Sequence, residues 1–456
     1  MTVVVVGAGL GGLRVANQLY AKHGIRATVI EAAPRVGGRI RSQYDSNGEL
    51  AYEGGPWRIP SSHTRMMKLV DNLGVHIDRL PFDAPTHAPM CDSRGLSRWE
   101  AALLDGAPPL ACDEADLSSG YAGQAHCASG TSPYSTDAST YYTVREGFQR
   151  GIADTMANDI GVLLNTRVTD IQRLDSGAYR VECRCRDETG FHTEHYECHA
   201  VFICVPPSAA GEWSIVRQWG RAQVNAVSAE PLQHVYAQSK RPLHPFHILD
   251  STGPLAQVIS PCYTWSTWFQ ASYSGGRVAR FWHRLRMIDP IAFAKRIREE
   301  LWQRWNIQVD EDVQVHHAER AYHIWKPAPN FCLNSAVAAA VMLHPARLPG
   351  VYWVGEAFSS FQGWMEGALE TAELAVAIYG GRCSYVLPTR ALGSNEVVVD
   401  DRIICVDAFK RGHPGGEGAL RSHLGEDVSE LFRHIGHSDN AWSVVNSLQV
   451  AVLANN

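Results

Sequence analysis

Residues 7–12 (GAGLGG) have the residue types and spacing of a turn that binds a nucleotide. In the pattern Gly-x-Gly-x-x-Gly, Gly7 permits the tight turn, Gly9 lets the backbone approach a pyrophosphate, and Gly12 lets a helix pack closely on a strand. The N-terminus of that helix offers free N–H donors and a partial positive charge to phosphate oxygens. Glu31 follows Gly12 by 19 residues, where a carboxylate can bind ribose hydroxyls. These residues predict a dinucleotide site.

The elements that must hold this turn form a βαβ unit. Residues 2–6 and 26–30 are strand-like apolar runs, and Leu13, Ala16 and Leu19 recur at helical spacing between them. Later apolar runs predict four more strands and a helix, at residues 167–171, 178–185, 200–205, 351–355 and 364–379. The predicted fold class is therefore α/β with α+β elements: a Rossmann-like domain, an interleaved substrate domain, and a small α+β unit at the C-terminal end.

Residues 31–39 (EAAPRVGGR) resemble the E-x-x-x-R-x-G-G-R segment of the flavin amine oxidase superfamily. The resemblance implies that Arg39 lies along the pyrophosphate of FAD, where a guanidinium forks onto phosphate oxygens. It also places Arg35 near the adenosine half. Residues 354–357 (VGEA) resemble the second FAD segment of the family, with Glu356 near the ribityl and pyrophosphate region. Val168 matches a position whose backbone contacts adenine.

Residues 363–368 (GWMEGA) resemble the closing motif of the same family, so the resemblance spans about residues 2–380. In that motif a helix N-terminus points at the flavin pyrimidine ring and stabilises the negative charge of reduced flavin. Trp364 stands where the family has an aromatic residue beside flavin and substrate, and Phe331 is a candidate for the second aromatic wall. Cys332 lies near the position of covalent attachment in monoamine oxidases, but its spacing from Trp325 is too short. FAD is therefore expected to bind non-covalently.

Residues 53–60 (EGGPWRIP) bear on the substrate. They resemble the G-P-M-R-x-P segment of L-amino acid oxidases and tryptophan monooxygenases, whose arginine clamps the substrate carboxylate. At that position Arg58 would bind a carboxylate bidentately and fix the α-carbon above the flavin. A structural ion pair is the alternative for Arg58, and Arg65 is a second candidate, expected on a helix surface. Monoamine and polyamine oxidases usually have no arginine here.

One departure from the family concerns a lysine that is commonly hydrogen-bonded through water to flavin N5. The best match here is residues 231–236 (PLQHVY), where His234 replaces the lysine. A histidine can still hold a water, or act as a base near neutral pH. An unrelated strand histidine is the alternative. The departure bears on reactivity with oxygen more than on flavin binding.

The C-terminal unit carries a second resemblance. Residues 413–416 (HPGG) are the core motif of cytochrome b5-type domains, and residues 436–438 (GHS) resemble the second ligand motif. The resemblance implies that His413 and His437 are the axial ligands of haem b. Two imidazoles give a low-spin iron with no open position, which suits electron transfer and not oxygen binding.

Some features of the C-terminal unit depart from that family. The first helix and the Trp-containing strand are reduced to residues 396–399, so weak haem binding, completion of the fold by the flavin domain, or a haemless relic stays open. His423 and His434 are rival ligands, but neither lies in a motif.

Composition restricts the partners and the compartment. The net charge of −6 gives no indication of nucleic-acid binding, and no run of about 18 apolar residues predicts a membrane span. The apolar run at residues 2–6 leaves no room for a secretory signal, so the chain is expected to be cytoplasmic. The eleven cysteines are scattered and odd in number, which argues against a disulfide framework. Cys183 and Cys185 should share one strand face, but without a second pair or a histidine cluster nearby no zinc site is expected.

The resemblances imply one reaction and leave two alternatives. FAD would oxidise the α-amino group of an L-amino acid to an imino acid, which hydrolyses to a 2-oxo acid and ammonia. The electrons would pass to O2, giving peroxide, or singly to the fused haem. The alternatives are an amine or polyamine oxidase, against which Arg58 argues, and a non-catalytic flavin–haem redox partner. The expected partners are a small-molecule substrate and O2 or a redox partner, and homodimer formation stays open.

The predicted domain boundaries follow from these motifs. The flavin amine oxidase-like region is residues 1–385, and residues 386–395 link it to the haem domain, residues 396–456. Within the first region the FAD-binding parts are about residues 1–60, 145–210 and 345–385, and the substrate-binding parts are about residues 61–144 and 211–344.

Overall fold

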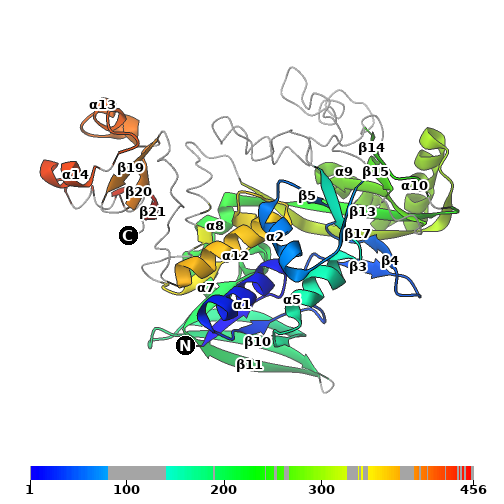
Figure 1. The fold of residues 1–456 in the computed structure, drawn as a ribbon, viewed down its shortest axis with the longest axis horizontal. Coiled ribbons are helices and arrows are strands. Elements are labelled where there is room, and N and C mark those ends of the chain that lie inside the picture. The colour runs from blue at the N-terminus through cyan, green and yellow to red at the C-terminus, as the bar shows by residue number, and fades with distance from the viewer. Residues whose placement is uncertain are drawn as a thin grey trace.

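The computed structural model of the chain arranges its elements in two interleaved units and a third, C-terminal unit (Figure 1). The described residues are 2–80, 140–187, 190–241, 243–250, 254–260, 267–325, 337, 340–341, 348–380, 395–399, 402–407, 409–426, 428–438, 441, 444–445 and 448–452. Phe331 and Cys332 lie outside this range.

The first unit is built on a parallel sheet with the strand order β18-β12-β1-β2-β8. Its central strand β1 (Val3–Val6) pairs with β12 (Ala200–Ile203) on one side and with β2 (Thr28–Ile30) on the other. The edges are β18 (Val351–Trp353) and β8 (Val162–Leu163). Because the strands are parallel, the carboxyl ends of strands far apart in the sequence lie along the same side of the sheet, where the glycine turn after β1 also lies.

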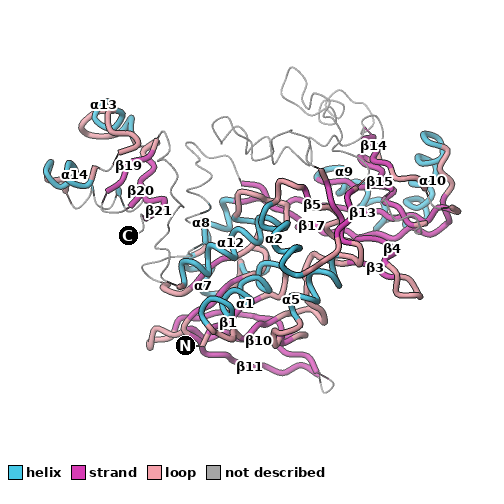
Figure 2. The backbone as a smooth tube through the Cα atoms, viewed as in Figure 1, coloured by secondary structure: helices cyan, strands magenta, loops and turns pink. Residues whose placement is uncertain are grey.

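Side chains alternate across β1, so its two faces enter different cores. The odd-numbered valines of β1 pack with helices α1 (Leu10–His23) and α12 (Met365–Tyr379). The even-numbered valines pack toward an antiparallel sheet of β9 (Thr166–Arg173), β10 (Tyr179–Asp187) and β11 (Gly190–Cys198). Figure 2 shows the helices and this sheet on opposite sides of β1. The arrangement confirms the predicted α/β fold class.

The second unit is an antiparallel sheet with the strand order β14-β15-β16-β13-β17. Its strands are β13 (Val227–Ser239), β14 (Phe246–Asp250), β15 (Ala256–Ser260), β16 (Trp268–Gly275) and β17 (Val309–Trp325). Helices α9 (Gly276–Ile288) and α10 (Pro290–Trp305) pack on this sheet around the fully buried Trp282. Apart from residues 231–236, the sequence matched no specific pattern in this stretch.

Shorter elements connect the two units. They are β3 (Ser42–Tyr44), β4 (Leu50–Glu53), β5 (Ile59–Pro60), α2 (Thr64–Leu73), β6 (Ile77–Arg79), β7 (Tyr141–Val144), the π-helix η1 (Gln149–Asp154), α5 (Thr155–Ala157), α6 (Pro207–Ala210), α7 (Ser214–Trp219), α8 (Arg221–Ala226) and the 3-10 helix η2 (Glu356–Phe358). No helix within the described residues is both long and apolar enough to cross a bilayer.

The third unit has a hydrophobic core of its own. Strands β19 (Glu396–Val399), β20 (Arg402–Cys405) and β21 (Gln449–Val452) form its sheet. The helical elements η3 (Lys410–Gly412), α13 (Glu417–Arg421) and α14 (Ser429–Ile435) lie beside it. The core residues come from both layers: Val397, Val399, Ile404, Val406 and Val445, with Leu420, Leu424, Val428, Phe432 and Leu448 packed against them.

Candidate functional site

The turn after β1 needs glycine at two positions for packing and leaves open space at a third. Gly7 has φ +101°, and a Cβ on Gly12 would lie 1.9 Å from the carbonyl oxygen of Gly7, so neither position accepts a side chain. A Cβ on Gly9 would have no protein atom nearer than 4.0 Å, the Cα of Gly38. The space beside Gly9, in front of the N-terminus of α1, matches what a bound pyrophosphate requires.

The second glycine pair lies directly against the first turn. The N–H of Gly37 donates to the carbonyl oxygen of Ala8 at 2.8 Å, and a Cβ on Gly38 would lie 3.2 Å from the Cα of Gly9. The Arg35 guanidinium donates to the carbonyl oxygens of residues 36, 38 and 40 and thereby closes the Gly-Gly turn. The predicted contact of Arg35 with adenosine stays a prediction. Two glycine turns thus form a backbone-lined cradle that fits a dinucleotide.

Glu31 organises the adenosine end of this cradle. Its carboxylate accepts from the N–H groups of Ala8 and Ala33, each at 2.8 Å, and its carbonyl accepts from the Thr166 N–H at 2.9 Å. The hydrogen bond from the Thr166 N–H places β9 beside the end of β2. Val168 follows Thr166 on β9 and is nearly buried. The structure therefore brings together Glu31 and the strand of Val168, which are far apart in the sequence.

Arg39 and Glu356 form an ion pair beside the same cradle. Nη1 of Arg39 donates to Oε1 of Glu356 at 2.7 Å and to the carbonyl oxygen of Ala321. Burial alone would raise the pKa of Glu356, but the Arg39 charge and hydrogen bonds from His323 and the Gly363 N–H lower it to about 2. The Arg39 side chain is 46% exposed, and a guanidinium has five N–H donors. Donors therefore remain for a phosphate.

The N-terminus of α12 is joined to α2 by a buried carboxylate. Glu366, in the first turn of α12, accepts from the backbone N–H groups of Arg65 and Met66 at 3.0 and 2.9 Å. These N–H groups lie in the first turn of α2, which has no cap of its own from His63. Arg65 also forms ion pairs with Glu366 and Glu373, at 3.2 and 3.5 Å. Arg65 thus lies on a helix, as expected, and its ion pairs join α2 to α12.

Arg58 lies in a cage of aromatic rings. Its Cζ atom is 4.7 Å from the ring centroid of Trp57, 4.6 Å from that of Tyr141 and 5.7 Å from that of Trp364. Nη1 of Arg58 and Nε1 of Trp364 are both buried and have no hydrogen-bond partner among the residues that the structure describes. The Arg58 charge also acts on His63, whose pKa is lowered to about 3 by burial and by Arg58. The structure thus brings Arg58 and Trp364 together, as the sequence predicted, and adds Tyr141.

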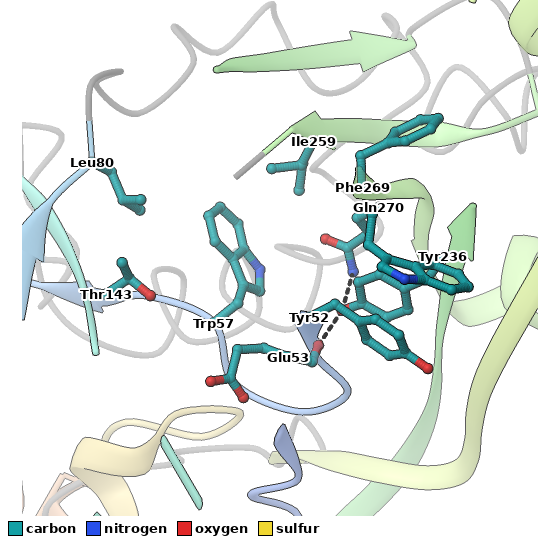
Figure 3. A pocket seen from close by; sticks show the side chains of 10 residues that line it. Tyr52, Glu53, Trp57, Leu80, Thr143, Tyr236, Ile259, Phe269 and Gln270 are labelled. Atoms are coloured by element: carbon teal, nitrogen blue, oxygen red, sulfur yellow. Dashed lines mark hydrogen bonds between the residues drawn. The ribbon is translucent and has the colours of Figure 1, made fainter. Parts of the chain in front are cut away.

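A small cavity adjoins this cage on the side of Trp57 (Figure 3). Figure 3 shows Trp57 between Leu80 and Thr143 on one side and Gln270 on the other. The remaining lining is mostly aromatic or aliphatic: Tyr52, Glu53, Tyr236, Ile259, Trp268 and Phe269. Glu53 is fully buried, and burial raises its pKa to about 8 despite hydrogen bonds from the Phe148 N–H and Ser42. The cavity therefore favours an apolar occupant.

His234 belongs to a hydrogen-bond network beside the cavity and not to the Arg58 cage. Nδ1 accepts from the Gln270 amide at 2.8 Å and contacts the hydroxyl of Tyr236 at 3.2 Å, and that hydroxyl donates to the carbonyl oxygen of Glu53. Burial and the nearby His316 lower the pKa of His234 to about 3. Because His234 then stays neutral at physiological pH, a base that titrates near pH 7 is disfavoured, and the water-holding role stays a prediction.

His413 and His437 meet in the third unit, with ring centroids 6.4 Å apart. Nδ1 of each ring contacts a backbone carbonyl oxygen: that of Gly416 at 3.4 Å for His413, and that of Phe432 at 2.9 Å for His437. This leaves both Nε2 atoms for a metal. A ligand nitrogen lies about 2 Å from a transition metal and the ring centroid roughly 1 Å beyond it, so two axial rings stand about 6 Å apart. The pair therefore fits a bis-histidine haem.

Replacing Gly9 with valine tests the cradle. The protein around Gly9 has room for a side chain, so the variant should fold, but the added isopropyl group would occupy the space assigned to the pyrophosphate. We expect Gly9→Val to purify largely without FAD, as measured by the flavin absorbance per chain. Gly161→Val is a matched control, because a Cβ on Gly161 also meets no atom within 4 Å and lies outside the cradle. Full FAD occupancy in Gly9→Val would show that the pyrophosphate lies elsewhere.

Comparisons with known proteins agree with this geometry. Residues 10–98 and 115–378 match the family of flavin containing amine oxidoreductases, and residues 396–454 match the cytochrome b5-like heme/steroid binding domain. Solved structures with a similar fold include a putative protoporphyrinogen oxidase from Exiguobacterium, at 13% identity and a TM-score of 0.58, and a redesigned putrescine oxidase, at 15% identity and a TM-score of 0.59. Each alignment covers 84% of this chain and 99% of the other.

Among curated proteins, an L-amino-acid oxidase of Mus musculus is 43% identical over 75 residues, which are 16% of this chain and 12% of that protein. A putative L-amino-acid oxidase of Bacillus subtilis is 36% identical over 88 residues, 18% of each chain. Cytochrome b5 of Saccharomyces cerevisiae is 37% identical over 54 residues, 12% of this chain and 45% of that protein. The chain thus matches less than a fifth of the length of these two oxidases.

Proposed function

The chain belongs to the flavin containing amine oxidoreductases, with a cytochrome b5-like domain at its C-terminal end, and we propose that it oxidises the α-amino group of L-amino acids. Proteins of the first family bind FAD and the second domain binds haem, and the residues around Gly9 and between His413 and His437 fit these groups. When bound, FAD supplies the two-electron chemistry that an amine oxidation requires. The residues of this chain must supply substrate binding and orientation.

The buried Nη1 atom of Arg58 is the observation that carries the proposal. A buried donor left without a partner costs about 1–3 kcal/mol, and more when it is charged. A substrate carboxylate satisfies that donor through a charge-assisted hydrogen bond, and a fork of two bonds would fix the orientation of the α-carbon. An amine without a carboxylate leaves the donor unsatisfied. Arg58 therefore favours amino acids over simple amines.

The cavity beside Trp57 supports an apolar side chain on the substrate. Its lining is mostly apolar, and the Glu53 carboxyl, with its raised pKa, carries little negative charge there. A cationic side chain would find no charged partner among the lining residues that the structure describes. Buried apolar area then adds to the binding free energy of the substrate.

For the electrons we propose transfer to the haem of the same chain, with O2 as the alternative acceptor. The geometry of His413 and His437 supports an iron with both axial positions filled, which exchanges electrons and does not bind O2. The homodimer, the cytoplasmic location and the domain boundaries given above remain predictions.

Anaerobic flavin bleaching across a substrate panel tests the proposed reaction. The panel pairs each L-amino acid with its decarboxylated amine, so that only the carboxylate differs. We expect fast bleaching by amino acids with apolar side chains and little by their amines. Fast bleaching by the amines alone would instead establish an amine oxidase. Slow bleaching by every compound would favour a redox partner without substrate oxidation.

A further inference from the structure

The hairpin of β10 and β11 places three ligand-type side chains on one face. Cys185 on β10 is directly opposite Cα of His192 on β11. Glu194 lies two residues beyond His192, and because side chains alternate along a strand, it shares the same face. No histidine cluster near the two cysteines could be recognised in the sequence, because only the antiparallel pairing brings His192 to Cys185.

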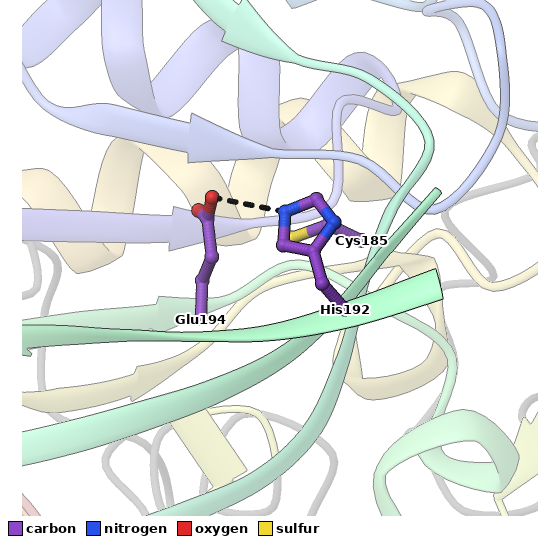
Figure 4. A group of neighbouring side chains, drawn as sticks. All are labelled: Cys185, His192 and Glu194. Atoms are coloured by element: carbon purple, nitrogen blue, oxygen red, sulfur yellow. Dashed lines mark hydrogen bonds and ion pairs between the residues drawn. The ribbon is translucent and has the colours of Figure 1, made fainter. Parts of the chain in front are cut away.

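The three ligand atoms converge on one point. The Cys185 sulfur, a His192 ring nitrogen and a Glu194 carboxylate oxygen all lie within 4.8 Å of one another. Nε2 of His192 is 3.2 Å from Oε1 of Glu194. Figure 4 shows the Cys185 sulfur beside the His192 ring, which faces the Glu194 carboxylate. Tetrahedral ligands about 2.0–2.3 Å from one ion are separated by distances in this range.

Asp187 and Tyr196 contact two of these ligands and hold them in an orientation that suits metal coordination. Nδ1 of His192 is 3.4 Å from Oδ2 of Asp187, and the hydroxyl of Tyr196 donates to Oε2 of Glu194. A carboxylate on one ring nitrogen fixes the tautomer that presents the other nitrogen to a metal. A surface ion pair would explain the contacts of His192 with the two carboxylates. The thiol at the same point is nearly buried, on the face of β10 that packs into the core.

We propose that Cys185, His192 and Glu194 bind one Zn²⁺ ion, with water as the fourth ligand. A mixed set of thiolate, imidazole and carboxylate suits zinc better than magnesium or calcium, which prefer oxygen ligands alone. A cysteine binds zinc as the thiolate, so the metal must displace the thiol proton, and zinc affinity should rise with pH. Cys185 also pairs in register with Thr166, whose N–H donates to the carbonyl oxygen of Glu31. The ion would therefore hold β11 against β10, beside the end of the cradle where adenosine is expected.

Zinc content of the purified full-length protein tests the proposal. After equilibration with Zn²⁺ and gel filtration, elemental analysis should give one zinc per chain, counted separately from haem iron. His192→Ala should lower the zinc affinity at least about tenfold, and Cys185→Ala should do the same. His195→Ala is the matched control, because His195 lies on the same strand but points to the opposite face. Its zinc content should equal that of the wild type.

Cobalt gives a second, spectroscopic readout. Co²⁺ in a tetrahedral site with a thiolate should absorb in the red part of the spectrum, seen as the difference between the cobalt and zinc forms. His192→Ala, whose side chain is 42% exposed, should fold normally and lose this band. Wild type without retained zinc, or variants with unchanged zinc and cobalt spectra, would overturn the proposal. An equal loss of zinc in His195→Ala would overturn it as well.

Discussion

Arg58→Ala is expected to raise KM for amino acids by about 100-fold while leaving the FAD content unchanged. The substitution removes a buried charge-assisted pair with the substrate carboxylate, worth roughly 1.5–3 kcal/mol, and each 1.4 kcal/mol is a factor of about ten in affinity. Decarboxylated amines make no use of that pair. Their KM should therefore change little, so that the discrimination between an amino acid and its amine collapses. Steady-state kinetics on matched substrate pairs measure both effects.

Two further variants separate charge from packing in this result. Arg58→Lys keeps the positive charge but not the planar fork, so we expect an intermediate KM. Arg26→Ala is the matched control, because its guanidinium also lies over an aromatic ring, Tyr20, at 4.5 Å, but on the protein surface. An unchanged KM in a folded, flavin-loaded Arg58→Ala protein would remove Arg58 from the substrate site and favour amine oxidation.

Replacing either His413 or His437 with alanine is expected to abolish the low-spin haem spectrum. In the proposed site each would supply one axial nitrogen, and a six-coordinate low-spin iron requires both. Flavin bleaching by substrate should be intact, because both residues lie in the third unit, which has its own core. Absorbance spectra of the haem-reconstituted variants, oxidised and reduced, measure the first effect, and anaerobic stopped-flow spectra measure the second.

His423→Ala is the control for this experiment, because His423 lies in the same unit but contacts Glu426 at 2.9 Å. Its haem spectrum should match the wild type.

In the wild type, substrate added without oxygen should bleach the flavin before the bands of reduced haem appear. An unchanged haem spectrum in the double variant would contradict the ligand assignment. Haem that stays oxidised beside fully reduced flavin would contradict electron transfer to the third unit.

The sequence predicted those parts of the fold where local pattern and long-range packing agree. The runs at residues 2–6, 200–205 and 351–355 each contain a strand of the parallel sheet that is buried on both faces and therefore apolar throughout. Strand β11 (GFHTEHYEC) is polar at most of its residues and was not predicted. It lies at an edge and is held by pairing with β10, a long-range contact that periodicity does not reveal.

The candidate site was predictable to a similar extent. Gly9, Arg58 and Trp364 belong to motifs with strict spacing, and the family resemblance of these motifs led to the prediction that they lie near cofactor or substrate. Tyr141 could not, because it reaches Arg58 only through the pairing of β5 with β7. Likewise nothing in the sequence indicated that Glu53 is fully buried in the cavity wall, or that His234 is held neutral by its surroundings. Burial and hydrogen-bond partners are properties of the folded chain.

The carboxylate of Glu366 links two walls of the aromatic cage around Arg58. It joins the start of α12, just after Trp364, to the start of α2, just after the segment that carries Arg58. With 1% of its side chain exposed, this link is shielded from competing water. We therefore expect the two walls, and with them Arg58 and Trp364, to keep their relative positions during thermal fluctuation.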